Sequence, residues 1–150
     1  MFFKDNYNFL SNFYILENPI LGIGMTWFYS VENAYQAEKI IYCLNLPYEK
    51  RKEMVQQFKN FTSGQAKSAG KRLSQRPDFD RTLWQENSIQ LMTTLVQYKF
   101  RINPDLMTRL KAIEGEIVED NNWGDTFWGR CYGVGENHLG RILMKVRDEQ

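Results

Sequence analysis

Four polar side chains are spaced so that a single helix would present them together. At positions i, i+3, i+4 and i+7 of a stretch of good helix formers stand Glu32, Tyr35, Gln36 and Lys39. On an α-helix these positions share one face over two turns. A carboxylate, a phenol, an amide and an ammonium on one face are the groups that a hydrolytic site or a polar ligand would use. The alternative is the solvated face of an amphipathic helix, and the spacing alone favours that alternative.

A second chemical signal is a lysine on a helix face that must be buried. Leu95 and Met92 precede Lys99 by four and seven residues and belong to the apolar stripe of the longest expected helix. Lysine is almost never fully buried without a partner. Lys99 therefore either extends its ammonium to solvent at the helix end or meets an anion in a cleft. Because it lies in the last turn, where a cation suits the helix dipole, a purely structural role stays open.

A glycine-rich segment before the last expected helix is the third signal. Residues 125–137 have the sequence DTFWGRCYGVGEN, which combines an acid, an arginine and three glycines. Backbone amides at a helix N-terminus bind phosphate readily, although glycines in loops more often serve tight turns. The segment lacks the last glycine of the Gly-x-Gly-x-x-Gly fingerprint and the strand–loop–helix context of a dinucleotide site, so it predicts no Rossmann cofactor.

The histidine and cysteine content limits the catalytic chemistry. His138 is the single histidine, which removes most Ser–His and Cys–His schemes and any multi-histidine metal site. Cys43 and Cys131 are far apart and lack metal-ligand spacing. We therefore expect no metal and no cofactor, and any catalysis should depend on carboxylates, lysines and backbone amides.

The elements that position these groups are expected to be mostly helices. Periodicity predicts helices over about 30–43, 47–59, 62–73 and 79–101, another that begins at Asn103-Pro104, and a last one through 139–146. Their expected N-terminal caps are Ser30, Thr62, Asp78 and Asn137. Short strands are expected around 13–16 and 25–29, with Gly22-Ile23-Gly24 as a hairpin turn, and near 116–119. The fold class is thus α+β: one helix-rich domain over 1–150, with about six helices and a small β-sheet.

Composition excludes several classes of protein. The chain has 150 residues, 43% hydrophobic and 25% charged, which is typical of one globular domain with a real core. A net charge of +1 lacks the basic excess of a protein that binds nucleic acid stably. An aromatic share of 15% is more than such a core needs, so some rings are expected to line a ligand cleft.

The N-terminus and the cysteines indicate where the protein works. The first residues, MFFKDN, have no cationic region before an apolar core, so no signal peptide is predicted. The most apolar stretch, 20–29, is about half a membrane span. Two unpatterned cysteines suggest a reducing compartment. We expect a cytoplasmic protein with no membrane contact.

Several segments, taken in order, resemble the NADAR superfamily. Residues 9–14 (FLSNFY) resemble its N-terminal element, and residues 29–39 (YSVENAYQAEK) are similar to its first helix. Its long helix is matched by Trp84, Met92, Lys99-Phe100 and Asn103-Pro104. Its C-terminal block is matched by Val118-Glu119, Asp125, Trp128-Gly129, Gly135, Asn137, Leu139-Gly140, Leu143-Met144 and Arg147. The resemblance covers nearly the whole chain. Two departures are the segment 112–115 (AIEG) in place of a Thr-Gly turn, and a short stretch after Gly129.

The resemblance implies an N-glycosidase of the YbiA-like type, which hydrolyses a C1–N bond between ribose and a base or amine. One branch of the family cleaves ribosylamine 5′-phosphates, early riboflavin-pathway intermediates, and another removes ADP-ribose from guanine bases. The expected partner is therefore a small-molecule ribosyl phosphate or an ADP-ribosylated guanine, with nucleic acid only as a substrate. The alternative is a non-catalytic module that binds ADP-ribose or a nucleotide. The presence of both Glu32 and Lys39 at the family's positions argues against it.

The chemistry implied by the resemblance divides the expected roles by side-chain type. Cleavage passes through an oxocarbenium-like state, which Glu32 or Glu119 would stabilise, or either would activate water. Lys39 or Lys99 would bind the phosphate or form a Schiff base at C1. The catalytic candidates are Glu32, Lys39, Glu119 and Asp125. The candidates for substrate binding are Asn12, Phe13, Tyr35, Gln36, Lys99, Trp128, Gly135 and Asn137. Of these, Phe13 or Trp128 would stack on the base, while Asn12, Asn137 and Asp125 would bond ribose hydroxyls or the base edge.

Overall fold

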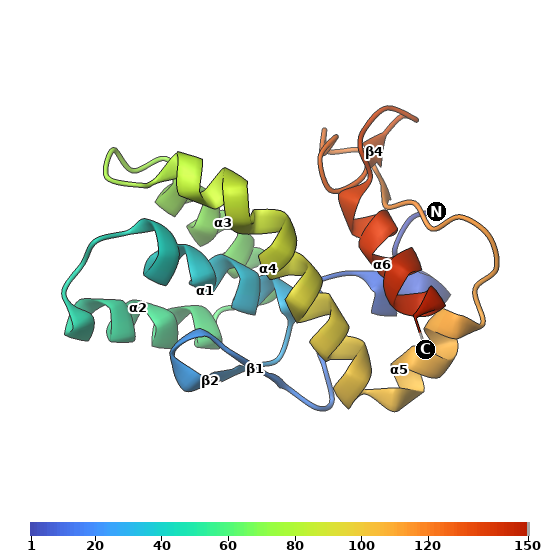
Figure 1. Ribbon diagram of the computed structural model, residues 1–150, viewed down its shortest axis with the longest axis horizontal. Coiled ribbons are helices and arrows are strands. Elements are labelled where there is room, and N and C mark those ends of the chain that lie inside the picture. The colour runs from blue at the N-terminus through green and yellow to red at the C-terminus, as the bar shows by residue number, and fades with distance from the viewer. Residues whose placement is uncertain (150) are drawn as a thin grey trace. The chain divides into compact units, whose positions relative to one another are not determined.

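The helices expected from periodicity form, and with short strands they give an α+β fold (Figure 1). The computed structural model describes residues 1–149. Its α-helices are α1 (Val31–Cys43), α2 (Tyr48–Asn60), α3 (Ser63–Ser74), α4 (Arg81–Ile102), α5 (Pro104–Lys111) and α6 (His138–Asp148). Two 3₁₀-helices are η1 (Asp5–Leu10) and η2 (Ile23–Met25). The strands are β1 (Ile20–Gly22), β2 (Thr26–Phe28), β3 (Asp120–Asn121) and β4 (Arg130–Cys131). The predicted helix-rich α+β class is confirmed.

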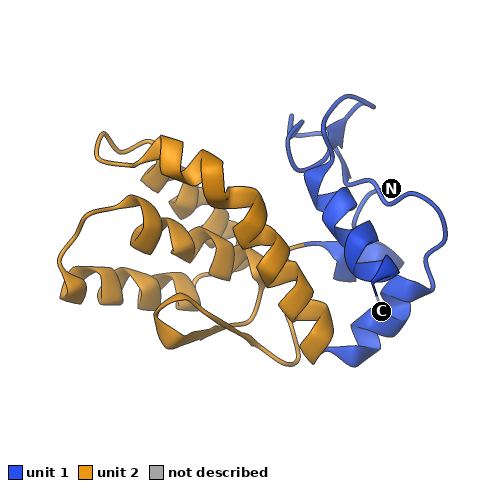
Figure 2. Ribbon diagram, viewed as in Figure 1, with its two compact units in different colours: residues 1–11, 103–150 blue, residues 12–102 orange. Residues whose placement is uncertain are grey.

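The chain packs as two compact units, coloured separately in Figure 2. Unit 2 is continuous and consists of residues 12–102. Unit 1 combines residues 1–11 with the chain from Asn103 onward. Each unit has buried apolar side chains of its own.

Unit 2 is organised around helix α1, which packs against α2, α3 and α4. The helix begins where predicted, because the Ser30 hydroxyl accepts the backbone N–H of Asn33 at 3.0 Å. The Asn33 side chain in turn donates to the carbonyls of Phe58 and Phe61, each at 2.8 Å, and so joins α1 to the end of α2. Helix α3 begins with the predicted capping box between Thr62 and Gln65. Local capping and neighbouring helices together fix α1.

A β-hairpin in unit 2 differs from the prediction in its first strand. Strands β1 and β2 pair antiparallel with Ile20 opposite Phe28, and η2 forms the turn between them. The predicted strand over 13–16 is wrong. In this segment the Leu16 N–H donates one hydrogen bond of 2.7 Å to the carbonyl of Tyr29, just beyond β2. Residues 13–16 do not form a strand. The antiparallel partner of β2 is 20–22, and the segment 13–16 is irregular.

The start of helix α4 also corrects a prediction. Asp78 was expected to cap it, but the Asp78 carboxylate pairs with Arg76 at 2.9 Å. The cap is Asp80, whose Oδ1 accepts the backbone N–H of Leu83 at 3.0 Å. Both aspartates precede the same apolar stripe, and the ion pair with Arg76 leaves the capping position to the second one.

In unit 1, side-chain hydrogen bonds replace part of a predicted strand. A strand was expected near 116–119, whereas the strand pair is Asp120–Asn121 with β4, in parallel. The Ile117 carbonyl and the Glu119 N–H are both bonded to the Asn137 side chain, each at 3.0 Å, and not to a neighbouring strand. The prediction was therefore right about the region and early by a few residues.

Helix α6 begins at the predicted position without the predicted capping bond. Asn137 stands at the N-cap in the left-handed region, with φ of 56°, and its side chain bonds back to 117–119. Helix α6 packs against α5. The buried apolar residues of unit 1 are Phe9, Leu10, Leu106, Leu110, Ile117, Leu139, Ile142, Leu143 and Val146. Over residues 1–149, no helix combines the length and the apolar character that a membrane crossing requires.

Candidate active site on helix α1

The four-residue polar face of α1 is buried. The side chains of Glu32, Tyr35, Gln36 and Lys39 are only 5–7% exposed. The alternative of a solvated helix face is therefore wrong, because α2, α3 and α4 surround α1 and leave it no such face. A buried carboxylate and a buried lysine on one helix need partners, since an uncompensated buried charge costs several kcal/mol.

Glu32 is held from both its backbone and its side chain. Its backbone N–H donates to the Asn12 carbonyl at 3.0 Å. Its carboxylate Oε1 accepts Nε2 of Gln36 at 2.9 Å, one helical turn further on. The Gln36 amide lies directly against Gly70 of α3, where a Cβ atom would overlap it. The glycine therefore gives Gln36 the room to bind Glu32.

Lys39 extends from α1 into a set of partners on α3 and α4. Its Nζ donates to the Gly70 carbonyl at 3.1 Å and to Ser74 Oγ at 2.8 Å. The same nitrogen lies 5.4 Å from the ring centroid of Trp84. Burial lowers the pKa of Lys39 to about 8, and the nearby negative charge of Glu32 opposes that shift. A lysine with this pKa holds a neutral fraction near neutral pH, which a base or a nucleophile needs.

Trp84, which lies beside Lys39, packs against two further aromatic rings. The ring centroids of Tyr35 and Trp84 are 5.0 Å apart, and those of Phe79 and Trp84 are 6.5 Å apart. Gly70, Ser74 and Trp84 were not among the predicted site residues. One sequence signal was available for Gly70: a glycine inside a helix costs about 1 kcal/mol relative to alanine, which indicates a close approach.

Lys99 is fully buried at the end of α4, with 1% of its surface exposed. It does not extend to solvent, so that alternative is wrong. Its Nζ lies 5.8 Å from the Tyr14 ring centroid and 5.1 Å from that of Phe100. Burial lowers the pKa of Lys99 to about 7. This is the stronger perturbation of the two lysines, and perturbed groups concentrate at functional sites.

Asn12 and Phe13 lie next to each other before the hairpin. Asn12 Nδ2 contacts the Met92 sulfur at 3.4 Å, and its Oδ1 is a buried acceptor without a partner. Phe13 is 40% exposed, and the Lys67 ammonium lies 5.8 Å from its ring centroid. Ser63 Oγ at the start of α3 donates to the Phe13 carbonyl at 3.0 Å. The predicted stacking residue Phe13 is thus accessible, and the polar head of Asn12 has unused hydrogen-bonding capacity.

In unit 1, Asp125 shapes the loop that leads to Trp128. Its Oδ1 accepts the backbone N–H groups of Phe127 at 3.1 Å and Trp128 at 2.9 Å. Its backbone N–H and carbonyl are both bonded by the Asn121 side chain, at 3.0 and 2.8 Å. The bond from the Phe127 N–H to the Asp125 carboxylate, two residues earlier, is an Asx turn. The Trp128 ring packs edge-on against Phe127 with centroids 4.9 Å apart.

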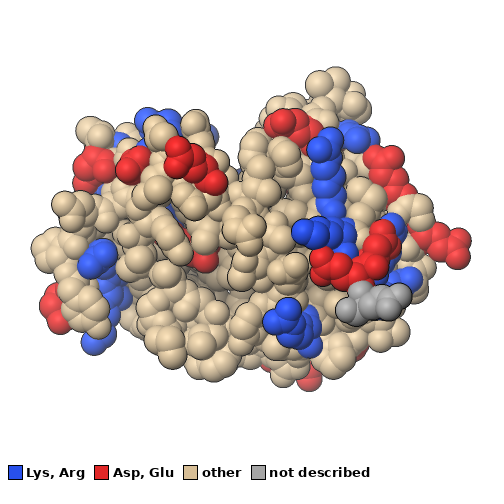
Figure 3. Space-filling model, viewed as in Figure 1, with Lys and Arg blue, Asp and Glu red and all other residues tan. Residues whose placement is uncertain are grey.

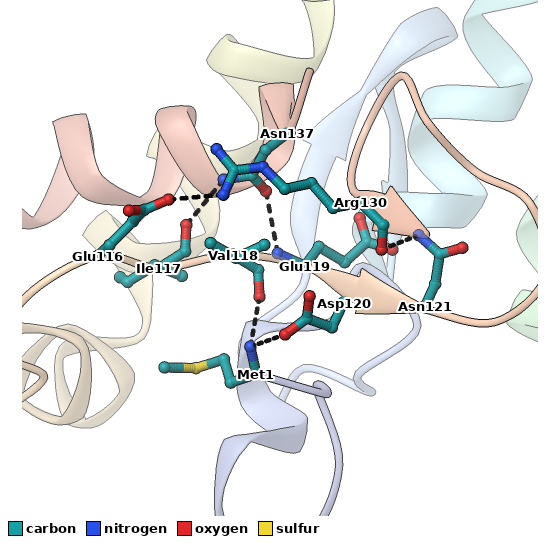
Figure 4. Close-up of polar contacts among 9 residues, drawn as sticks. All are labelled: Met1, Glu116, Ile117, Val118, Glu119, Asp120, Asn121, Arg130 and Asn137. Atoms are coloured by element: carbon teal, nitrogen blue, oxygen red, sulfur yellow. Dashed lines mark hydrogen bonds and ion pairs between the residues drawn. The ribbon is translucent and has the colours of Figure 1, made fainter. Parts of the chain in front are cut away.

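The Asn137 side chain binds the backbone of the segment 117–119, as Figure 4 shows. Asn137 Oδ1 accepts the Glu119 N–H, and its Nδ2 donates to the Ile117 carbonyl. Gly135 has φ of 147°, and a Cβ there would overlap the Gly129 carbonyl. Glycine at 135 and asparagine at 137 are therefore both required by the loop backbone. Near them, Arg130 pairs with Glu116 at 2.9 Å.

Within each unit, several of the predicted residues contact one another. In unit 2, α1 brings together Glu32, Tyr35, Gln36 and Lys39, and Asn12 bonds to Glu32. In unit 1, Glu119 and Asn137 are directly bonded, and Asp125 holds Trp128. Within residues 1–149, no three His, Cys, Asp or Glu side chains gather as a metal ion would require. On the face drawn in Figure 3, basic and acidic side chains are interspersed.

Comparisons with known proteins give one consistent family. A family model described as the NADAR domain matches residues 1–149. N-glycosidase YbiA of Escherichia coli is 28% identical over 147 residues, which cover 97% of this chain and 83% of that protein. The NMR structure of E. coli YbiA matches with a TM-score of 0.73 and 26% identity, over 97% of this chain and 79% of that chain.

Two further relatives are longer proteins. The chloroplastic riboflavin biosynthesis protein PYRR of Zea mays is 32% identical over 131 residues, 85% of this chain and 20% of that protein. A riboflavin biosynthesis protein of Vibrio vulnificus is 30% identical over 146 residues, 97% of this chain and 36% of that protein. The chain therefore spans about a fifth and about a third of their respective lengths.

Proposed function

The chain belongs to the NADAR family, and from that membership we propose that it is an N-glycosidase that hydrolyses a C1–N bond between a ribose and a base or amine. The observation that carries the proposal is the buried row on α1. There Gln36 holds the Glu32 carboxylate, and Lys39 with its lowered pKa lies on the same face. A purely structural helix would gain more from apolar side chains at these positions.

The chemistry of the reaction assigns roles to the two charged residues of the row. Cleavage of a ribosyl C–N bond develops positive charge at C1, and the Glu32 carboxylate stabilises it or activates the attacking water. The hydrogen bond from Gln36 fixes the orientation of this carboxylate before the substrate binds. Lys39 transfers a proton or acts directly at C1, for which its pKa of about 8 suits neutral pH. Tyr35 and Gln36 contribute the polar lining of the site.

The substrate proposed first is a ribosylamine 5′-phosphate of riboflavin biosynthesis, since two relatives carry that pathway in their names. ADP-ribose attached to guanine is the second candidate, supported by the exposed aromatic ring of Phe13 beside Lys67. Lys99 is proposed to bind the phosphate. A bound anion would raise the lowered pKa of this lysine, which favours binding over a covalent role.

Roles for the unit 1 residues are proposed separately. Glu119 is the alternative to Glu32 as the carboxylate that acts at C1, and Asp125 is a catalytic candidate whose Oδ1 also builds the loop. Trp128 would stack on the base. Gly135 and Asn137 would present the loop backbone to the substrate. A cytoplasmic location stays a prediction, and the maize relative is named chloroplastic.

The proposal is tested by product analysis. Purified protein is incubated with a ribosylamine 5′-phosphate of the riboflavin pathway, ADP-ribosylated guanine DNA, ADP-ribose and NAD, and the products are identified by mass. Release of ribose 5-phosphate, or of free guanine-containing DNA and ADP-ribose, supports the N-glycosidase. Tight binding of ADP-ribose with no product from any substrate would instead support the non-catalytic binding module.

Site variants connect the activity to α1. Glu32→Gln and Lys39→Met should each lower turnover by roughly 10²-fold or more, the usual scale for acid–base groups. Glu86→Gln is the matched control, because Glu86 lies on the exposed surface of α4. Near wild-type rates in both site variants, at unchanged thermal stability, would remove α1 from the mechanism.

A further inference from the structure

Lys39, Ser74 and the Gly70 carbonyl form a closed hydrogen-bonded triangle in unit 2. Lys39 Nζ donates to Ser74 Oγ at 2.8 Å and to the Gly70 carbonyl at 3.1 Å. Ser74 Oγ also donates to the same Gly70 carbonyl, four residues earlier in α3, at 3.1 Å. A charged lysine offers no acceptor, so the single hydroxyl proton of Ser74 is available for the Gly70 carbonyl. Only the lone pairs of Oγ remain for Lys39, so Ser74 can act toward the lysine only as an acceptor.

The triangle restricts the direction of the lysine nitrogen. A lysine nitrogen is tetrahedral, and one of its four positions is the bond to Cε. Two N–H bonds are directed at acceptors on α3, one to Gly70 and one to Ser74. The fourth position holds an N–H when the lysine is charged and a lone pair when it is neutral. With two positions fixed on α3, the fourth points away from that helix in both states.

We propose that Ser74 is a positioning residue for Lys39: its hydroxyl and the Gly70 carbonyl hold two N–H bonds, so that the reactive position of the nitrogen keeps one direction whether the lysine is charged or neutral. The proposal rests on the proposed function, in which Lys39 acts at the reaction centre. Without Ser74, only the Gly70 carbonyl would remain on α3, and the nitrogen could rotate about the Cδ–Cε bond and leave the productive geometry.

The chain offers matched variants for the test. Ser74→Ala removes the acceptor, whereas Ser74→Thr keeps a hydroxyl that can bond the carbonyl four residues earlier in a helix. Ser68→Ala is the control, because Ser68 lies on the exposed side of the same helix. The ionisation of Lys39 is followed by NMR in the full chain with 13C-labelled lysine. The Lys39 signal is assigned by its loss in Lys39→Met.

We expect the pKa of Lys39 to change only in Ser74→Ala. The Ser74 acceptor stabilises the charged amine more than the neutral one, so its loss should lower the pKa of Lys39 by about one unit. Ser74→Thr and Ser68→Ala should leave this pKa in place. The kcat of Ser74→Ala, taken at the pH of its own maximal rate, should fall by roughly tenfold with little change in KM, and Ser74→Thr should restore it.

Two outcomes overturn the proposal. One is a Lys39 titration in Ser74→Ala that coincides with that of Ser68→Ala. The other is a folded Ser74→Thr protein whose Lys39 titration matches that of Ser74→Ala, because a restored hydroxyl should then have restored the bond. The titration needs no turnover. An inactive wild-type protein would therefore refute the proposed function while the NMR result still decides the contact between Ser74 and Lys39.

Discussion

Substitution of Gly70 by alanine tests whether close packing between α1 and α3 holds the candidate site together. A Cβ atom at position 70 would overlap the Gln36 amide, whose Nε2 binds Glu32. Gln36 is buried, so its amide cannot move aside into solvent. We expect Gly70→Ala to displace Gln36 and to break its bond to the Glu32 carboxylate.

The magnitude follows from three terms. Replacing glycine by alanine inside a helix contributes about 1 kcal/mol in favour of the variant. Overpacking of a close contact costs about 1–3 kcal/mol, and loss of a hydrogen bond to a charged group costs about 1.5–3 kcal/mol. The net loss should be about 3 kcal/mol in the free energy of unfolding, or a fall in Tm of roughly 6–12 °C for a chain of this size.

Urea unfolding of a double-mutant cycle measures this effect. In the Gln36→Ala background the obstacle is gone, so adding Gly70→Ala should stabilise the protein by up to about 1 kcal/mol. Gly64→Ala in the same helix is the control and should stabilise in both backgrounds, because a Cβ at Gly64 meets nothing within 4 Å. If Gly70→Ala stabilises the wild-type background as Gly64→Ala does, the argument from packing is wrong.

Three further predictions concern charge and metal ions. Burial raises the pKa of Glu38 from 4.5 to about 8, so the stability that this residue contributes is full below pH 4.5 and is lost as the pH rises to 8. In urea unfolding, Glu38→Gln should therefore gain stability relative to wild type between pH 5 and pH 8. A difference in stability that does not change with pH would refute the raised pKa. Burial lowers the pKa of Lys99 from 10.5 to about 7, so the stability that Lys99 contributes is full above pH 10.5 and is lost as the pH falls to 7. The stability of wild type relative to Lys99→Met should therefore rise from pH 7 to pH 9. A difference in urea midpoints that does not change with pH would contradict a buried amine. Turnover should survive excess EDTA, and complete loss of activity that one divalent ion restores would show that the site needs a metal.

The sequence alone determined most of the secondary structure and the polar row on α1. Helical periodicity and capping residues are local signals, so the helix that begins at Ser30 and the capping box at Thr62 formed where predicted. The spacing of Glu32 and Lys39 on one face is likewise a property of the helix itself. Strand positions depend on partners that are distant in the sequence: β2 pairs with 20–22, and the strand predicted over 13–16 did not form.

Only the tertiary structure decided whether that polar row was a surface or a site. A helix face is solvated or buried according to what packs on it, and three other helices pack on α1. The partners of Lys39 illustrate the reason, because Ser74 and Trp84 lie 35 and 45 positions away in the sequence and approach it only when α3 and α4 fold against α1. The lowered pKa values of Lys39 and Lys99 arise in the same way: no local pattern contains the loss of hydration that packing imposes on them.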